Sequence, residues 1–178
     1  MKYRRFLVPG IVILVIVGFV ALLTVGLFMK EPLTGASGSA RVGRPAADFT
    51  LPLFSGGELT LSSLEGTPVV INFWASWCPP CREEALILEE VWQLYRDQGI
   101  TFIGVDIQDK EEDARAFVEE FGITYPNGQD LDGRITIDYG VAGIPVTFFI
   151  NSEGLIVSRW VGAINRNLLV ERVEELLK

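Results

Sequence analysis

The sequence of residues 69–81 is VVINFWASWCPPC, and it decides the fold. Its first seven residues are mostly β-branched or aromatic with almost no polar alternation, which predicts an interior β-strand. Pro79 and Pro80 favour the start of a helix, because the first helical turn has no intrahelical partner for the N–H that proline lacks. A buried strand therefore runs into a helix, and the two cysteines lie at the junction.

These two cysteines, Cys78 and Cys81, are the only ones in the chain. Cys78 is expected at the helix N-terminus, where the helix dipole and unpaired N–H groups stabilise a thiolate and make the sulfur nucleophilic. Cys81 follows one turn later, deeper and less accessible, and is placed to resolve a mixed disulfide. The pattern predicts redox chemistry at this pair.

Other roles for the cysteines are weaker. A structural zinc site needs about four ligands, whereas the chain has two cysteines and no histidine. A purely structural disulfide would close a very short loop and remove little entropy from the unfolded chain, so it is a minor alternative. Without histidine, Ser-His, Cys-His and histidine–metal chemistry are not available. We expect no metal and no cofactor.

Four segments carry a resemblance to a known family. Trp74–Arg82 resembles the active site of the thioredoxin superfamily, and Gly143–Thr147 resembles the loop that carries its cis-proline. Gly43–Leu51 and Asp130–Val141 are similar to the membrane-anchored ResA/TlpA/CcmG group of thiol-disulfide oxidoreductases, within the redoxin or AhpC-TSA-like family. The similarity covers residues 41 to 178.

This resemblance, together with the order of the predicted elements, implies an α/β thioredoxin-like fold. A mixed central sheet would be flanked by helices on both faces, with an N-terminal β-hairpin extension. A short strand and a turn are expected within residues 123–142. The remaining predicted elements are a hairpin in 41–66, helices at 79–98, around 114–121 and around 169–177, and strands at 100–107, 146–150 and 155–160.

The N-terminal segment predicts a membrane anchor. Residues 6–29 contain no charged side chain, and a helix of that length, at ~1.5 Å per residue, spans more than the ~30 Å core of a bilayer. The basic residues Lys2, Arg4 and Arg5 precede it, so the N-terminus is expected to be cytoplasmic. We therefore expect a single-pass signal-anchor in the cell membrane.

The predicted organisation is an anchor at 1–30, a flexible Gly/Ser/Ala-rich tether at 31–42 and an extracytoplasmic thioredoxin-like domain at 43–178. The alternative is a cleaved signal peptide ending near Ala40, although this site lies well past the apolar segment. From Arg41 onward the chain has 22 acidic and 11 basic residues, a formal charge of −11. That balance argues against nucleic acid or anionic lipid as a partner and favours solubility.

Glu84 is the candidate proton carrier. It lies three residues after Cys81, on the helix face that should meet the sheet, and partial desolvation would raise its pKa into a range suited to exchange with a thiol. The alternative is a solvated helix face, to which we assign Glu83. In thioredoxins a buried aspartate stands six residues before the first cysteine; here that position is Asn72, which cannot act as a base.

A second set of residues is expected to bind substrate. The resemblance implies a cis bond before Pro145, which would expose the backbone of Ile144 to an extended polypeptide. Trp77 would shield the thiol, whereas Trp74 and Phe73 would belong to the core. The expected substrate-binding residues are Trp77, Pro79, Pro80, Ile144 and Pro145.

The expected function is thiol-disulfide exchange. By resemblance, the enzyme reduces disulfides of exported proteins such as apocytochrome c during cytochrome c biogenesis, and a transmembrane thiol reductase recharges it. The alternatives are a thiol-dependent peroxidase, a general oxidant of exported proteins, and a non-enzymatic redox-sensing adaptor. Redox poise depends on how well each thiolate is stabilised, so the sequence leaves the direction of the reaction open.

Overall fold

The computed structural model describes residues 42–178. They form a five-stranded sheet in the order β5-β4-β3-β6-β7, and a two-stranded sheet of β1 and β2. The elements are β1 (Thr50–Pro52), β2 (Glu58–Thr60), η1 (Leu61–Leu64), β3 (Val69–Trp74), α2 (Pro79–Tyr95), η2 (Arg96–Gln98), β4 (Thr101–Asp106), α3 (Glu111–Glu120), β5 (Asn127–Gln129), α4 (Arg134–Asp138), β6 (Val146–Ile150), β7 (Ile156–Val161) and α5 (Arg166–Leu176).

The predicted membrane anchor and nearly all of the tether lie outside the described residues. Within residues 42–178, none of the helices combines the length and the apolar character needed to cross a bilayer.

Strand β3 is the centre of the sheet. It pairs in parallel with β4 and antiparallel with β6, which makes the sheet mixed. All six of its residues are buried, because helices or other chain segments cover both faces of the sheet. The interior strand predicted from its uninterrupted apolar sequence is confirmed.

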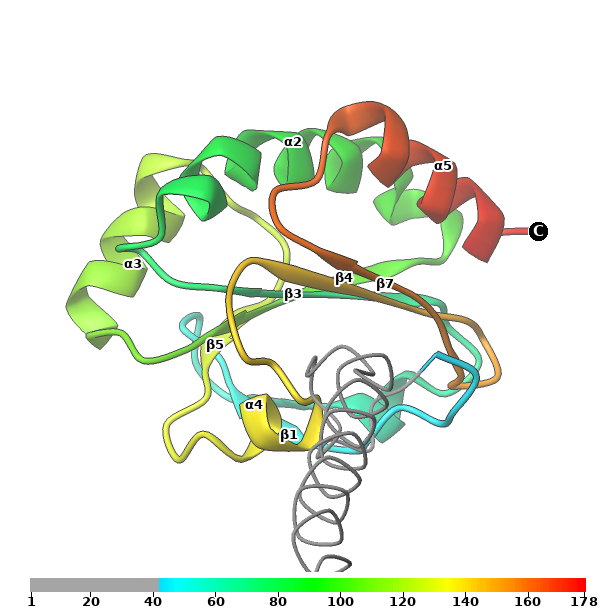
Figure 1. The fold of residues 1–178 in the computed structure, drawn as a ribbon, viewed down its shortest axis with the longest axis horizontal. Helices are drawn as coiled ribbons and strands as arrows, with labels where there is room; N and C mark the ends of the chain where they lie inside the picture. Colours follow the sequence, from blue (N-terminus) through cyan, green and yellow to red (C-terminus); the bar gives the residue numbers. More distant parts are fainter. Residues whose placement is uncertain (1–41) are drawn as a thin grey trace, which may run out of the picture. The chain divides into compact units, whose positions relative to one another are not determined.

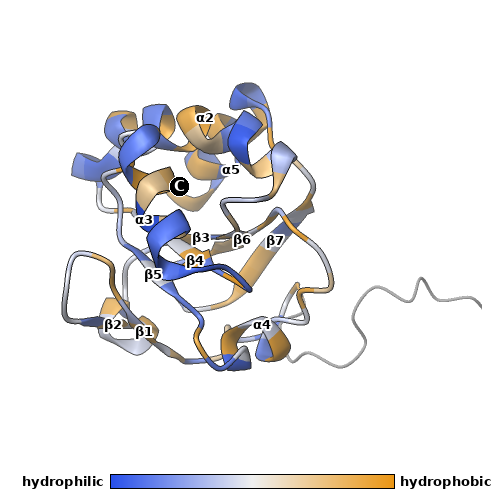
Figure 2. Cartoon of the chain, turned by 90° about the vertical axis from the view of Figure 1, so that its left-hand side faces the viewer, coloured by the Kyte–Doolittle hydropathy of each residue, from blue (hydrophilic) through white to orange (hydrophobic). Residues whose placement is uncertain are grey.

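Helices cover both faces, as predicted. In Figure 1, α2, α3 and α5 lie on one side of the sheet, and α4 lies with β1 on the other. Alternate residues of each strand enter the two cores: Val70 packs in the core beneath α2 and α5, whereas Ile71 and Phe73 pack in the opposite core with Tyr139. Figure 2 shows apolar stretches in β4 and β7 between helices that carry both polar and apolar residues. The thioredoxin-like arrangement is confirmed.

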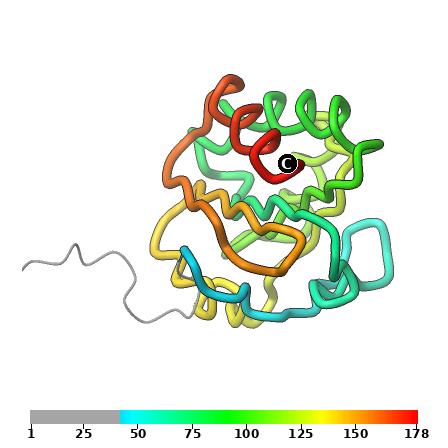
Figure 3. Tube along the Cα trace, turned by 90° about the vertical axis from the view of Figure 1, so that its right-hand side faces the viewer, coloured from blue at the N-terminus to red at the C-terminus, as the bar shows by residue number. Residues whose placement is uncertain are grey.

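The N-terminal extension reaches from one edge of the sheet to the other. We call residues 43–54 the strap. At its start, Gly43 N–H donates to the Ile156 carbonyl of β7 (2.7 Å), and at its end Phe54 N–H donates to the Asn127 carbonyl of β5 (2.8 Å). Figure 3 shows this segment crossing below the sheet, on the side of α4, before it turns into the hairpin. The predicted hairpin is present as β1 and β2.

The main difference from the sequence prediction is α4, which occupies part of the region where only a strand and a turn were expected. The carboxylate of Asp130 starts this helix by accepting the N–H groups of Ile135 (3.2 Å) and Thr136 (2.8 Å). A helix of five residues is too short to show a helical period, so its sequence carries no such signal. Smaller differences are that α2 ends at Tyr95 in a 3-10 turn and that β7 begins at Ile156.

Candidate active site

The two cysteines form a disulfide at the N-terminus of α2. Cys78 is the N-cap, with extended backbone angles, and Pro79 and Pro80 occupy the first two helical positions. The N–H of Cys81 donates to the sulfur of Cys78 at 3.3 Å. The sequence places this sulfur at a helix N-terminus because the apolar strand ends at Trp74 and the prolines fix the start of the helix.

The predicted difference in accessibility between the two sulfurs is wrong for the disulfide form. Cys78 and Cys81 are each 2% exposed and belong to the same core as α2. The reason is local: the two sulfurs are bonded to each other, and both side chains pack in the core on the α2 side of the sheet. A substrate that attacks this disulfide therefore needs a local opening around Cys78.

Glu84 lies on the buried face of α2, as predicted, and is fully buried. One carboxylate oxygen accepts the side-chain amide of Asn72 on β3 (2.8 Å), and the other accepts the backbone N–H of Ile164 before α5 (2.7 Å). The Asn72 amide also donates to the hydroxyl of Thr147 on β6 (3.1 Å). The carboxyl group thus joins the helix to β3 and to the segment that leads into α5, and Asn72 extends the connection to β6. Glu83 is exposed to solvent.

The environment of Glu84 suits proton transfer near neutral pH. Burial raises the pKa of its carboxyl from 4.5 to about 7, although the hydrogen bonds from Ile164 and Asn72 oppose the increase. A carboxyl with a pKa of about 7 releases and takes up a proton readily at that pH. Because Cys81 lies one turn earlier on the same buried face, Glu84 is placed to act on the inner thiol, and that role stays a prediction.

The loop that precedes β6 has the geometry predicted for substrate binding. The Ile144–Pro145 peptide bond is cis, and the next residue, Val146, pairs with Phe73 at the end of β3. Ile144 is half-buried against both cores. Its backbone N–H and C=O form no hydrogen bond with any other residue of 42–178. An extended substrate could pair with these free groups, as in strand addition.

The two tryptophans beside the motif have different environments. Trp77 is 56% exposed, and its indole N–H donates to the carbonyl of Gln108 (3.0 Å), which orients the ring on the surface. Trp74 is buried and stacks on Phe117. Phe73 is fully buried, so Trp74 and Phe73 belong to the core as predicted. Pro79 is exposed and Pro80 half-buried, which leaves both near the surface.

Sequence reasoning missed two groups of polar residues at the site. It treated Asn72 as a departure that removes a base, and the structure gives it the role of a hydrogen-bond donor to Glu84. It did not single out Asp106, the last residue of β4, or Asp109, whose carboxylate accepts the N–H of Ser76 in the loop leading into Cys78. Its position as a polar residue at the centre of an apolar strand could have identified Asn72, because buried amides need hydrogen-bond partners.

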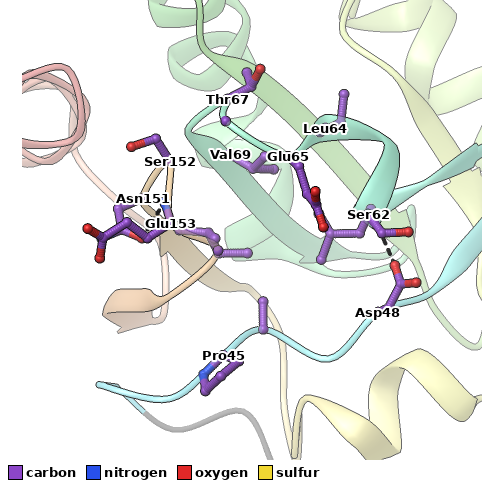
Figure 4. Close-up of a pocket in the computed structure, with 15 residues that line it drawn as sticks. Pro45, Asp48, Ser62, Leu64, Glu65, Thr67, Val69, Asn151, Ser152 and Glu153 are labelled. Atoms are coloured by element: carbon purple, nitrogen blue, oxygen red, sulfur yellow. Dashed lines mark hydrogen bonds between the residues drawn. The ribbon is translucent and has the colours of Figure 1, made fainter.

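A hollow at the other end of the sheet is separate from the thiols. It has a volume of about 480 Å³ and is lined near Val69 and Asn151, where β3 begins and β6 ends. Figure 4 shows that its polar side chains come from the strap, from the segment after β2 and from the β6–β7 turn, with Asp48 accepting the N–H of Ser62. Among residues 42–178 no group of three or more acidic, cysteine or histidine side chains could hold a metal ion.

Comparisons with known proteins agree with this geometry. Residues 42–159 match the model of the AhpC/TSA family. The thiol-disulfide oxidoreductase ResA of Halalkalibacterium halodurans is 34% identical over 139 residues, which cover 78% of each chain.

Solved structures show the same similarity. A candidate thiol:disulfide interchange protein DsbE from Chlorobium tepidum aligns with a TM-score of 0.74 and 30% identity, over 79% of this chain and 100% of the other. A secreted Mycobacterium tuberculosis disulfide oxidoreductase homologous to E. coli DsbE aligns with a TM-score of 0.67 and 30% identity, over 72% and 96% of the two chains. The cysteine pair at the helix start and the cis-proline beside it are thus those of an enzyme, and the chain belongs to the AhpC/TSA family as a ResA-type thiol-disulfide oxidoreductase.

Proposed function

We propose that this oxidoreductase works as a reductant of exported proteins, with apocytochrome c before haem attachment as its substrate. The proposal places the enzyme on the outer side of the cell membrane, held by the uncharged segment at residues 6–29 with the basic N-terminus inside. A transmembrane thiol reductase would return it to the dithiol form. The secreted relative supports an extracytoplasmic site.

The observation that carries the proposal is the buried carboxyl of Glu84 behind a disulfide at a helix N-terminus. In the dithiol form, the Cys78 thiolate attacks one sulfur of the substrate disulfide and expels the other as a thiolate. Cys81 then transfers its proton to Glu84 and attacks the Cys78 sulfur, which releases the second substrate thiol. Two electrons pass to the substrate, and the enzyme is left with the disulfide seen here.

The orientation of the substrate follows from the cis-proline loop. The free backbone groups of Ile144 would pair with the residues around the substrate cysteine, while Trp77 and Pro79 offer an apolar surface beside Cys78. Backbone pairing recognises any extended segment, so it suits an unfolded acceptor such as a cytochrome that has not yet bound haem.

The direction of the reaction is tested by the reduction potential of the cysteine pair. A reductant should have a potential closer to the about −270 mV of thioredoxin than to the about −120 mV of DsbA. Equilibration with glutathione or dithiothreitol buffers, followed by thiol alkylation, measures it. A potential near that of DsbA would assign the enzyme to oxidation instead.

The substrate is tested in cells that lack the gene. We expect covalently haem-bound cytochrome c to fall, and to recover with the wild-type chain or with added thiol reductant, while Cys78→Ser gives no recovery. Normal cytochrome c levels in the deletion strain would rule out this substrate.

The membrane anchor is tested by protease applied to intact spheroplasts, which should digest the domain and leave the N-terminal fragment in the membrane. Release of a soluble domain beginning near Arg41 would show a cleaved signal.

A further inference from the structure

A pair of carboxyl groups lies beside the loop that leads into Cys78, on a different strand from Glu84. Asp106 is the last residue of β4 and pairs in register with Trp74, the last residue of β3. Its side chain is fully buried. One carboxyl oxygen accepts the side-chain amide of Gln129 on β5 (3.0 Å), while no donor within residues 42–178 reaches the other, which has the Asp109 carboxyl as its neighbour. A buried oxygen without a donor calls for an explanation, because native proteins rarely leave one unpaired.

Asp109 links this position to the active-site loop. Its carboxylate accepts the backbone N–H of Ser76 at 2.6 Å. Between the two aspartates, Gln108 has a positive φ of 51°, and its carbonyl accepts the indole N–H of Trp77. Gln129 reaches both aspartates, since its amide also donates to the Asp109 carbonyl (2.9 Å). The positions of Ser76 and Trp77, directly before Cys78, therefore depend on the segment that carries the pair.

No positive charge balances the two carboxyls. Trp74 of β3 and Gln129 of β5 are uncharged, and no lysine or arginine of residues 42–178 forms an ion pair with either aspartate. The Asp130 carboxylate, after β5, is directed to the N–H groups that start α4. The charged side chains that follow Asp109 are exposed; they are Lys110 before α3 and Glu111, Glu112 and Asp113 in its first turn.

These surroundings favour a proton on Asp106. Burial and the neighbouring Asp109 carboxyl together raise the pKa of Asp106 from 3.8 to about 8, and the hydrogen bond from Gln129 opposes the increase. Asp106 therefore keeps its proton at neutral pH, and this proton relieves the repulsion between the two carboxyl groups.

We propose that Asp106 and Asp109 form a proton-dependent latch for the active-site loop. While Asp106 holds its proton, the Asp109 carboxylate keeps Ser76 and Trp77 in place before Cys78. When the proton is lost to water at higher pH, two adjacent negative charges repel each other, the 107–110 segment shifts, and Trp77 moves with it. The latch thus positions the surface that meets the substrate. The proposal rests on the thiol-disulfide exchange activity and not on which protein is reduced.

The test uses the fluorescence of Trp77 in the full-length, oxidised protein between pH 5.5 and 9.5. The chain has four tryptophans, so the Trp77→Phe spectrum is subtracted at each pH. The wild type should show a change with a midpoint near pH 8. Asp106→Asn, which is neutral at every pH and can still accept from Gln129, should keep the low-pH signal throughout.

Two control variants separate this group from other carboxyls. Glu112→Gln alters an exposed side chain on α3 and should keep the wild-type midpoint. Glu84→Gln removes the buried carboxyl of α2, which contacts Asn72 and Ile164 rather than the latch, and should also keep it. The exchange rate provides a second readout: the ratio of the Asp106→Asn rate to the wild-type rate should stay constant up to about pH 7 and change above pH 8.

The proposal is overturned by a wild-type signal that stays flat, or by a wild-type titration in Asp106→Asn. Circular dichroism checks that this variant is folded. If it is not, Asp109→Asn decides the matter: without the neighbouring charge there is no repulsion to move the 107–110 segment, so the pH-dependent change of the Trp77 signal should be absent, and a titration like that of the wild type would refute the latch. None of these outcomes bears on the reductase assignment, because no substrate protein is used.

Discussion

Replacing Glu84 with glutamine should change how the stability of the protein depends on pH. The pKa of Glu84 is about 7 in the folded protein and 4.5 without burial. Folding therefore favours the protonated form, so the stabilising contribution is complete below pH 4.5 and is lost as the pH rises through 7. At about 1.4 kcal/mol per pH unit, the gap corresponds to about 3 kcal/mol. Glutamine does not ionise, so Glu84→Gln should not show this loss, although its NH2 group cannot accept one of the two N–H donors that face Glu84.

The assay is urea unfolding of the oxidised protein at pH 4.5, 6 and 8, with the free energy extrapolated to zero denaturant. The lost acceptor destabilises the variant by a constant amount, so relative to the wild type the variant should gain up to about 3 kcal/mol of stability between pH 4.5 and pH 8. Contributions of other groups, Asp106 included, cancel in the difference. Glu83→Gln, on the exposed face of the same helix turn, should show no pH-dependent difference. A constant difference between wild type and Glu84→Gln over this range would refute the reasoning.

Three other changes test the remaining parts of the site. Cys81→Ser should accumulate mixed disulfides on Cys78, seen as reductant-sensitive adducts, whereas Cys78→Ser should accumulate none; equal trapping would contradict the roles assigned to the two sulfurs. Gly104→Ala should lower the free energy of unfolding by about 2 kcal/mol or more, because the new methyl group would lie 1.7 Å from a buried amide oxygen. Gly143→Ala, with open space around it, is the stability control, and equal melting temperatures for the two variants would count against this packing. Trp77→Ala should raise KM for a disulfide-containing peptide by about tenfold, equivalent to about 1.4 kcal/mol of docking energy, and an unchanged KM would remove Trp77 from the docking surface.

The sequence predicted those parts of the site that depend on local spacing. The apolar strand and the prolines placed Cys78 at the helix start, and three residues of helix placed Glu84 on the buried face. Both depend on contacts within one element, so periodicity was sufficient. The cis bond at Pro145 was predicted by resemblance and not by any local pattern, because an ordinary trans proline is also tolerated at the start of a strand.

The contacts that tune the site could not be predicted in this way. Glu84 contacts Asn72 on β3 and the backbone of Ile164, which lies 80 residues after Glu84 in the chain. Both contacts depend on how α2 lies over the sheet. The position of Asp106 next to the active-site loop follows from the parallel register of β3 and β4, which sequence periodicity does not define. The equal burial of Cys78 and Cys81 is a property of the disulfide form, and the sequence does not encode the oxidation state.

The strap of residues 43–54 has a consequence for aggregation. Outer strands of a sheet expose unpaired backbone groups that can template pairing with another chain. Here the strap pairs with part of both outer strands. Pro45 forms a bridge with Leu155, next to β7, and Leu53 forms a bridge with Gly128 of β5. A single cut within the strap would therefore uncover two distant edges at once, and self-association of the nicked protein should begin at the edges and leave the thiol chemistry unchanged.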